Sequence, residues 1–222
     1  MAESRASGLT LSHPSPTAMA LRPDGPDLLT TMMRRRSIKR LRAGPFSDAA
    51  LDRILEAVRL APAAFNQPPW RIVVVRQRLP QFWDVVAGAV RERLDGDRQT
   101  RYLDRIDGFR PGVATVLVYE AQASRTALQD AWGISPEQAA SFAEQGLGMV
   151  QLALWLAITG EGLSASLQHW EWLVEQPAAA FLGVPAGDFR LMAMLPIGYA
   201  DELPPPPNRP AVDDVVSIDR FG

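Results

Sequence analysis

The chain has 222 residues, of which 47% are hydrophobic and 22% charged, and its formal net charge is −2. This composition allows a substantial core, and the charge gives no electrostatic reason to expect nucleic acid or an anionic membrane as a partner. The absence of cysteine excludes disulfides, thiolate metal sites and a dithiol redox centre, and two histidines, His13 and His169, argue against a multi-histidine metal site. Any redox chemistry must therefore come from a bound cofactor.

The first 27 residues are rich in Ser, Pro, Gly and Ala and show no sustained periodicity. They lack the apolar stretch of roughly 7–15 residues that follows a basic start in a signal peptide. We therefore expect a flexible N-terminal extension over residues 1–27, a single domain over residues 28–222, and the cytoplasm as the location.

Helices and strands alternate along the rest of the chain. Asp27 and Ser47 are N-cap candidates for two helices, the second of which should end before Pro62. Short β-branched runs indicate buried strands, and apolar residues at helical spacing indicate further helices. The expected strands are 71–75, 113–120, 164–170 and 189–199; helices are expected around 82–90, 136–160 and 175–182.

The second half of the helix expected at 136–160, GLGMVQLALWLAITG, is apolar on nearly every side. A membrane span needs about 20 such residues, and this run is shorter and flanked by Glu144, Gln145 and Glu161. A helix that is apolar all round is enclosed by protein. We expect a central-core or dimer-interface helix, with part of its enclosure supplied by a second subunit.

The C-terminal segment, DELPPPPNRPAVDDVVSIDRFG, cannot be helical through its prolines, which favour an extended polyproline II geometry. It ends in four apolar residues, Val215, Val216, Ile218 and Phe221. We expect an extended arm whose apolar tip packs on its own domain or on a partner.

The basic segment RRRSIKR allows two interpretations. Arginines at the end of a helix complement the helix dipole, which would make the segment a solvated terminus. Alternatively, Arg35 and Arg36 offer forked donors and Ser37 a hydroxyl to an anion such as phosphate. Lys39, the only lysine in the chain, follows two residues later.

Two other segments also allow more than one interpretation. In FNQPPW, Asn66 and Gln67 belong either to a rigid turn or to an amide pair that reads the polar edge of a heterocycle. In GLSASLQHW, Gln168 and His169 close a small apolar strand and are either structural or functional. The GLGMV segment lacks the third glycine of a dinucleotide-binding loop, so we exclude that motif.

The order and spacing of these segments resemble the nitroreductase family. The family opens with a helix ending in Arg-Arg-Ser, here residues 35–37, followed about thirty residues later by an Ala-Pro-rich Asn-Gln loop, here APAAFNQPPW at 61–70. It closes with a Gly-led, Pro-rich tail containing an arginine, here residues 198–210. The intervening blocks are similar to the compact branch named after the fungal fatty-acid-repression mutant, and the resemblance covers roughly residues 28–216.

The resemblance implies an α+β nitroreductase-like fold, with a central, mostly antiparallel sheet flanked by helices. It also implies a domain-swapped homodimer with an extended C-terminal arm and two equivalent FMN sites at the dimer interface. The implied activity is that of an FMN-dependent NAD(P)H oxidoreductase, with NADH or NADPH as reductant. Hydride would pass by a ping-pong mechanism to nitroaromatic or quinone-type acceptors, with no side-chain acid or base.

The family's cofactor contacts transfer to matching positions here. Arg35, Arg36 and Ser37 would hold the phosphate and ribityl chain, and Arg209 would close on the phosphate. Lys39 would lie near the pyrimidine end, where a positive charge stabilises the anionic reduced flavin. The remaining implied contacts are Asn66 and Gln67 at the flavin, Gln168 and His169 on a strand whose backbone N–H groups meet the N5 edge, and Phe65, Trp170 and Trp172 as apolar walls.

The sequence departs from the family pattern in three places. Lys39 replaces the aromatic residue usual in the compact branch, and Pro68 replaces a Gln and so removes a backbone donor. Pro207 and Asn208 fill the part of the tail where some members carry a lysine. Three alternatives therefore stay open: a flavin-binding sensor with little turnover, a flavoenzyme of the same fold with a different reaction, and an α/β interaction domain without flavin.

Overall fold

The computed structural model describes residues 27–219, and the expected N-terminal extension lies almost wholly outside this range. Its central sheet is antiparallel, with strand order β1-β5-β3-β2 and a short strand, β4, that also pairs with β5. The strands are β1 (Leu41–Arg42), β2 (Trp70–Val75), β3 (Ala114–Ala121), β4 (Ser164–Ala165) and β5 (Phe189–Ala200). The predicted α+β class with a mostly antiparallel sheet is confirmed.

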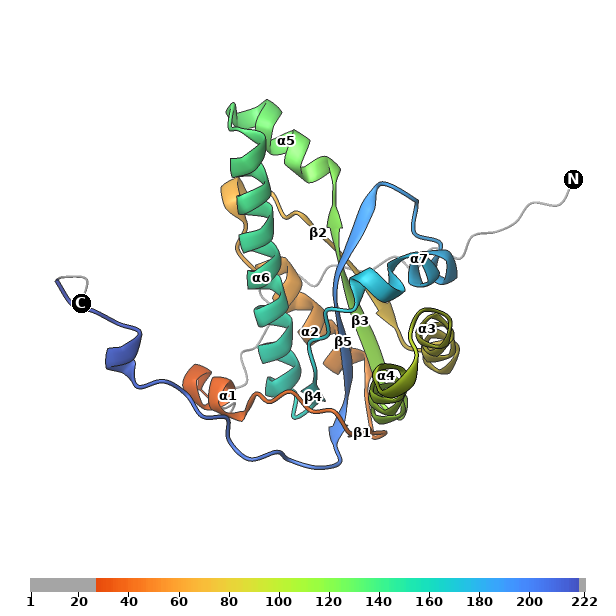
Figure 1. Cartoon of the computed structure of the whole chain (residues 1–222). Coiled ribbons are helices and arrows are strands. Elements are labelled where there is room, and N and C mark those ends of the chain that lie inside the picture. Colours follow the sequence, from red (N-terminus) through yellow and green to blue (C-terminus); the bar gives the residue numbers. More distant parts are fainter. Residues whose placement is uncertain (1–26, 220–222) are drawn as a thin grey trace, which may run out of the picture.

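Helices cover both faces of this sheet, as Figure 1 shows. They are α1 (Leu28–Arg34), α2 (Asp48–Leu60), α3 (Leu79–Arg93), α4 (Gly96–Phe109), α5 (Ala123–Trp132), α6 (Pro136–Gly160) and α7 (Glu171–Leu182). Two short 3-10 turns, η2 (Ala64–Asn66) and η3 (Val212–Asp214), complete the described elements.

Alternation along β3 divides the core into two halves. Val116 and Val118 face α2 and α6, whereas Leu117 and Tyr119 face α3, α4 and α7. Successive side chains of a strand point to opposite faces, so an uninterrupted apolar strand is buried on both sides. The result is a three-layer molecule whose middle strands, β3 and β5, are fully covered.

Helix α6 begins at a capping box, in which the Ser135 hydroxyl accepts from the Gln138 N–H while the Gln138 side chain accepts from the Ser135 N–H. One side of the helix packs on the sheet and on α2. The other side is open in the single chain, and Met149 and Leu152 are exposed there. Enclosure of α6 is therefore incomplete in one copy. No helix among residues 27–219 is long and apolar enough to cross a membrane.

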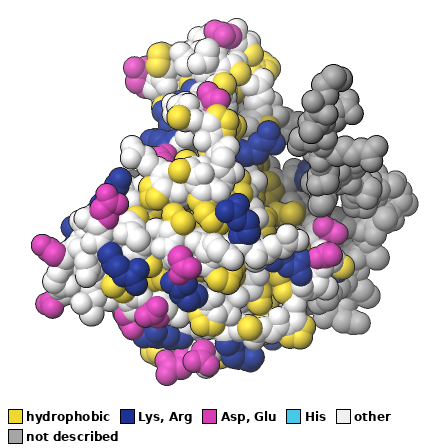
Figure 2. Space-filling view, turned by 90° about the vertical axis from the view of Figure 1, so that its right-hand side faces the viewer, with side chains coloured by type: hydrophobic (Ala, Val, Ile, Leu, Met, Phe, Trp, Pro, Cys, Tyr) yellow, Lys and Arg dark blue, Asp and Glu magenta, His cyan; other side chains and the backbone are white. Residues whose placement is uncertain are grey.

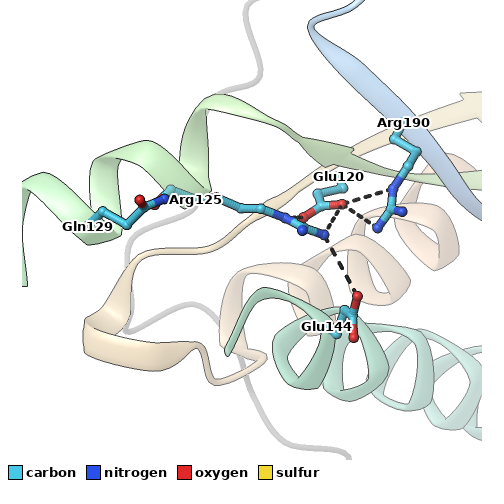
Figure 3. Close-up of polar contacts among 5 residues, drawn as sticks. All are labelled: Glu120, Arg125, Gln129, Glu144 and Arg190. Atoms are coloured by element: carbon cyan, nitrogen blue, oxygen red, sulfur yellow. Dashed lines mark hydrogen bonds and ion pairs between the residues drawn. The ribbon is translucent and has the colours of Figure 1, made fainter. Parts of the chain in front are cut away.

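A buried carboxylate joins the sheet to α5. Glu120, at the end of β3, is 1% exposed and receives hydrogen bonds from Arg125 of α5 (2.5 and 3.1 Å) and Arg190 of β5 (2.8 and 3.1 Å). Figure 3 shows the two guanidinium groups approaching the carboxylate from opposite sides. Glu120 therefore connects three elements, β3, α5 and β5. Glu144 of α6 lies 3.8 Å from Arg125 and adds a second, longer contact.

Beyond the sheet, residues 201–219 are exposed throughout, and Figure 1 shows them running past α1 and away from the body. Leu203, Val212, Val215, Val216 and Ile218 are exposed apolar residues of this arm, and Phe221 lies outside the described residues. Val215, Val216 and Ile218 are not buried on their own domain, so the prediction that the arm packs on a partner stays open.

Charge on the opposite side of the molecule is mixed. On the face shown in Figure 2, basic and acidic side chains are interspersed among hydrophobic ones. Such a surface has no large single-sign field to steer an ionic ligand.

Candidate functional site

Three arginines gather where α1 ends. Arg35 caps the C-terminus of α1, and its guanidinium carbon lies 4.3 Å from the centroid of the Trp155 ring in α6. Burial lowers the pKa of Arg35, and the positive charges of Arg209 and Arg36 lower it further. The tail therefore brings Arg209 close enough to Arg35 for their charges to interact.

These arginines have no acidic partner in the part of the chain that the structure describes. Among residues 27–219, no carboxylate forms an ion pair with Arg35, Arg36 or Arg209. Arg36 instead donates from Nη1 to the backbone carbonyls of Met33 and Arg35. Like charges held together without a counter-ion repel each other, and an anion would relieve that repulsion through charge-assisted hydrogen bonds. The cluster has the chemistry of a phosphate site.

The segment after the arginines runs beside β4. Ser37 forms a parallel bridge with Ala165, and the Ile38 N–H donates to the Ala165 carbonyl at 3.1 Å. Ile38 is 2% exposed, whereas its neighbours Ser37 and Lys39 are exposed. Because alternate residues of extended chain point to opposite sides, the buried isoleucine directs both polar residues outward.

The strand that continues from β4 offers free donors. The N–H groups of Ser166 and Gln168 bond to the β5 carbonyls of Pro196 and Met194, at 3.4 and 2.8 Å. Those of Leu167 and His169 point the other way and bond to none of the described residues. The Gln168 amide is turned back onto the Ser166 hydroxyl (2.8 Å) and the Leu167 carbonyl (3.0 Å). The Gln168 side chain therefore makes its hydrogen bonds within its own strand.

A basic groove of about 490 Å³ lies between Lys39 and α4. Gly108 allows the close approach, since a Cβ there would lie 2.1 Å from the Lys39 carbonyl oxygen. The groove is lined by Lys39, Arg40, Thr100, Arg101, Asp104 and Arg105.

One of the four cations in this groove is neutralised. Arg40 pairs with Asp104 at 2.5 Å, whereas no described carboxylate pairs with Lys39, Arg101 or Arg105. Sequence reasoning missed the two α4 arginines, although their spacing of four residues on one helix indicates a shared face.

The Asn-Gln loop has an unusual backbone. Phe65 and Asn66 adopt φ angles of 52° and 57°, in the left-handed region that a bulky residue such as Phe rarely enters. Phe65 is stacked on Trp132 of α5, with ring centroids 4.2 Å apart, and meets Phe142 of α6 edge-on at 5.9 Å. Strain of this kind persists where the surroundings fix it and often marks a functional loop.

Helix α6 separates this loop from the arginines. The loop contacts α6 near its start, at Phe142 and Gly146, whereas Arg35 contacts it at Trp155. At 1.5 Å per residue, Phe142 and Trp155 are about 20 Å apart along the axis. A single chain thus joins Arg35, Arg36, Ser37, Lys39, Arg209 and the strand of Gln168 and His169, but it does not bring Asn66 and Gln67 to them.

The expected apolar walls differ in exposure. Phe65 and Trp172 are 43% and 46% exposed, and Trp172 lies edge-on to Tyr102. Trp170 is 3% exposed and packs in the core beside Tyr102 and Phe109. Within the described residues, no group of three or more potential ligands from His, Cys, Asp and Glu could hold a metal ion.

Comparison with known proteins gives a consistent result. A protein-family sequence model described as the nitroreductase family matches residues 32–199. Nitroreductase CinD from Lactococcus lactis in complex with chloramphenicol has a TM-score of 0.77 and 23% identity, covering 87% of this chain and 100% of its own. A mutant of the FMN and NADPH-dependent nitroreductase NfnB from Sphigopyxis sp. strain HMH has a TM-score of 0.68 and 21% identity, covering 87% of this chain and 99% of its own. A nitroreductase with bound FMN from Desulfitobacterium hafniense DCB-2 has a TM-score of 0.64 and 20% identity, covering 86% of this chain and 97% of its own.

One curated protein also matches, an NADH dehydrogenase from Thermus thermophilus. It is 52% identical over 50 residues, which are 22% of this chain and 24% of that protein. The match therefore spans about a quarter of the curated relative's length.

Proposed function

Because the chain belongs to the nitroreductase family, we propose that it binds FMN and acts as an NAD(P)H-dependent oxidoreductase that reduces nitroaromatic or quinone-type acceptors. The observation that carries this proposal is the cluster of Arg35, Arg36 and Arg209 without a carboxylate partner among the described residues. Relatives described as FMN-bound or as FMN and NADPH-dependent support the choice of cofactor.

The residues present fit the phosphate end of FMN. Arginine presents several N–H donors in a fixed fork, and three such groups suit a doubly charged phosphate. The exposed Ser37 hydroxyl follows directly and would meet the phosphate or the ribityl chain. The Trp155 Nε1–H is buried without an acceptor among the described residues, which leaves a further donor beside the cluster.

The flavin ring would lie along the strand that follows β4. The N–H groups of Leu167 and His169 are free to donate to its N5 edge. Lys39 would meet the pyrimidine end, and Arg101 and Arg105 would add positive charge from the far wall of the groove. A positive field at that end favours negative charge on the bound ring.

When bound, FMN would supply the hydride-transfer chemistry between NADH or NADPH and the acceptor. The protein's part is to bind, to orient and to place charge, and we assign no side-chain acid or base. The exposed aromatic pair of Phe65 and Trp132 is suited to stack on a flat, electron-poor acceptor.

A complete site requires a second copy of the chain. We propose a homodimer in which the Phe65–Asn66 loop of one protomer reaches the arginine cluster of the other, because one chain holds them at different ends of α6. Exposed apolar residues on α1 and α6 are available for this interface, namely Leu28, Leu29, Met32, Met33, Met149 and Leu152.

The C-terminal arm would pack on the partner. The edge strand β2 and α2 border an apolar groove of about 310 Å³, lined by Leu55, Val58, Trp70, Arg71, Ile72 and Val74. An extended segment ending in Val215, Val216 and Ile218 matches such a groove, because an edge strand has unpaired backbone groups.

The test is to purify the protein, record its flavin absorbance before and after adding FMN, and follow NADH and NADPH oxidation with a nitroaromatic and a quinone. We expect a yellow protein that turns over both acceptors. A colourless protein that gains no FMN would contradict the proposal. Tight FMN binding with negligible NAD(P)H oxidation would instead favour the sensor alternative.

A further inference from the structure

Helix α6 presents one aromatic ring to the arginine cluster. Trp155 lies on the side of α6 that meets α1, partly buried against the core, and the guanidinium carbon of Arg35 is 4.3 Å from its ring centroid. The Thr159 hydroxyl donates to the Trp155 carbonyl at 2.9 Å, one turn further along. The ring therefore stands on a rigid element.

Arg35 needs such support because its charged neighbours repel it. Arg36 and Arg209 both act on its charge, and burial removes part of its hydration. A carboxylate would hold Arg35 in place but would also cancel the charge that an anion requires. An aromatic face attracts a guanidinium through its quadrupole and leaves the positive charge available. Trp155 can thus fix Arg35 without neutralising it.

The second observation is the orphaned donor on the same ring. The Trp155 Nε1–H is buried and has no hydrogen-bond partner among the described residues. Buried donors in folded proteins nearly always have an acceptor. An orphan beside Arg35, which has no carboxylate partner within residues 27–219, indicates that the surroundings of Trp155 are completed by an oxygen-rich ligand.

We propose that Trp155 is a positioning residue of the phosphate subsite, whose ring braces Arg35 toward the phosphate of FMN. This inference rests on the proposed function and adds a residue to it. Trp155 acts mainly through Arg35, so its contribution concerns the phosphate and not the flavin ring.

The test compares FMN with riboflavin, which has the same ring and ribityl chain but no phosphate. Apo-protein is titrated with each ligand and the flavin fluorescence is followed. We expect Trp155→Leu to weaken FMN binding about tenfold and to leave riboflavin affinity within about twofold of wild type. Trp155→Phe keeps an aromatic face and should bind FMN within about threefold of wild type.

Phe181→Leu is the matched control, because it removes a ring that lies 4.0 Å from another guanidinium, that of Arg78. It should change neither affinity. If Trp155→Leu unfolds in a thermal melt, Trp155→Met repeats the comparison with a side chain that fills more of the space.

An equal loss of FMN and riboflavin affinity would show a merely structural role and overturn the inference, as would unchanged FMN binding. Failure of the wild-type protein to bind FMN would contradict the proposed function instead. The two failures are therefore distinguishable.

Discussion

Arg35 combines three properties that seldom occur together on a protein surface. Its guanidinium is partly buried, it lies beside two other arginines, and it has no carboxylate partner among the described residues. Each property raises the free energy of the charged guanidinium group when no anion is bound. An anion that binds there relieves all three, so we expect Arg35 to contribute strongly to phosphate binding.

Replacement of this residue tests the phosphate subsite. Arg35→Ala is expected to weaken FMN binding by about 2 kcal/mol, or about 30-fold, the size of a hydrogen bond to a charged group. Isothermal titration with FMN measures the change. Arg91→Ala removes an exposed arginine of α3 and should leave FMN affinity unchanged. Equal affinities for wild type and Arg35→Ala would support the view that the arginines only end a helix.

Residues 35–39 could be predicted as a candidate site because their side chains are neighbours in the sequence. Arg101, Arg105 and Trp155 could not, because they reach the site through packing of α4 and α6 that local pattern does not encode. The side-chain roles of Gln168 and Trp170 were also beyond sequence reasoning, since one amide folds back on its own strand and one ring is enclosed by the core.

A buried tyrosine predicts how stability depends on alkaline pH. Burial, with a smaller contribution from Glu175, raises the pKa of Tyr119 to about 12. The unfolded chain ionises near pH 10, so the stability that comes from the neutral phenol is fully present below pH 10 and is lost as pH rises toward 12.

Tyr119→Phe should abolish this loss, because it has no ionisable group. Urea unfolding at pH 9 and pH 11.5 should show wild type losing about 2 kcal/mol more than the variant. The Tyr119 hydroxyl has no hydrogen-bond partner in the described part of the chain, so the variant should fold well at pH 9. Identical losses in the two proteins would show that Tyr119 is not the group responsible.

At the scale of elements, Glu120 determines how α5 is held against the sheet. Glu120→Gln removes a buried charge between Arg125 and Arg190. It leaves Arg190 without a carboxylate among the described residues and Arg125 with only the exposed Glu144. We expect a loss of about 3 kcal/mol in the free energy of unfolding, measured in urea. Glu144→Gln changes a carboxylate that is 61% exposed and 3.8 Å from Arg125, and should cost less than about 1 kcal/mol. Similar losses for the two variants would contradict this assignment.

Elements with strong apolar periodicity were predicted from the sequence, whereas polar ones were not. The strand 114–121 and the helix 136–160 match their predicted positions closely. Helix α4 was missed because most of its surface is charged, and it is held by a few apolar residues such as Ile106 and Phe109. The strand expected at 164–170 is only two residues long, followed by a single bridge at Gln168, because Pro196, which lies opposite Ser166, has no N–H to complete the pairing between them.

For the whole molecule, the open side of α6 predicts an obligatory dimer. Leu152→Glu would place a charge in the proposed interface, 45% exposed in one chain. We expect a monomer in analytical ultracentrifugation and a loss of most bound FMN, because each site requires the partner's loop. Leu60→Glu, at a residue of α2 that is 57% exposed, should remain a dimer with wild-type flavin content. A dimeric Leu152→Glu protein with full FMN would exclude this interface.

The central claim is that the arginine cluster and the strand after β4 together hold FMN at a composite site in a homodimer. Titration of the purified protein with FMN, followed by flavin fluorescence and by the mass of the complex, tests it most directly. The expected result is saturable binding of one FMN per protomer by a dimer. Unchanged flavin fluorescence and a colourless protein after removal of free FMN would contradict it.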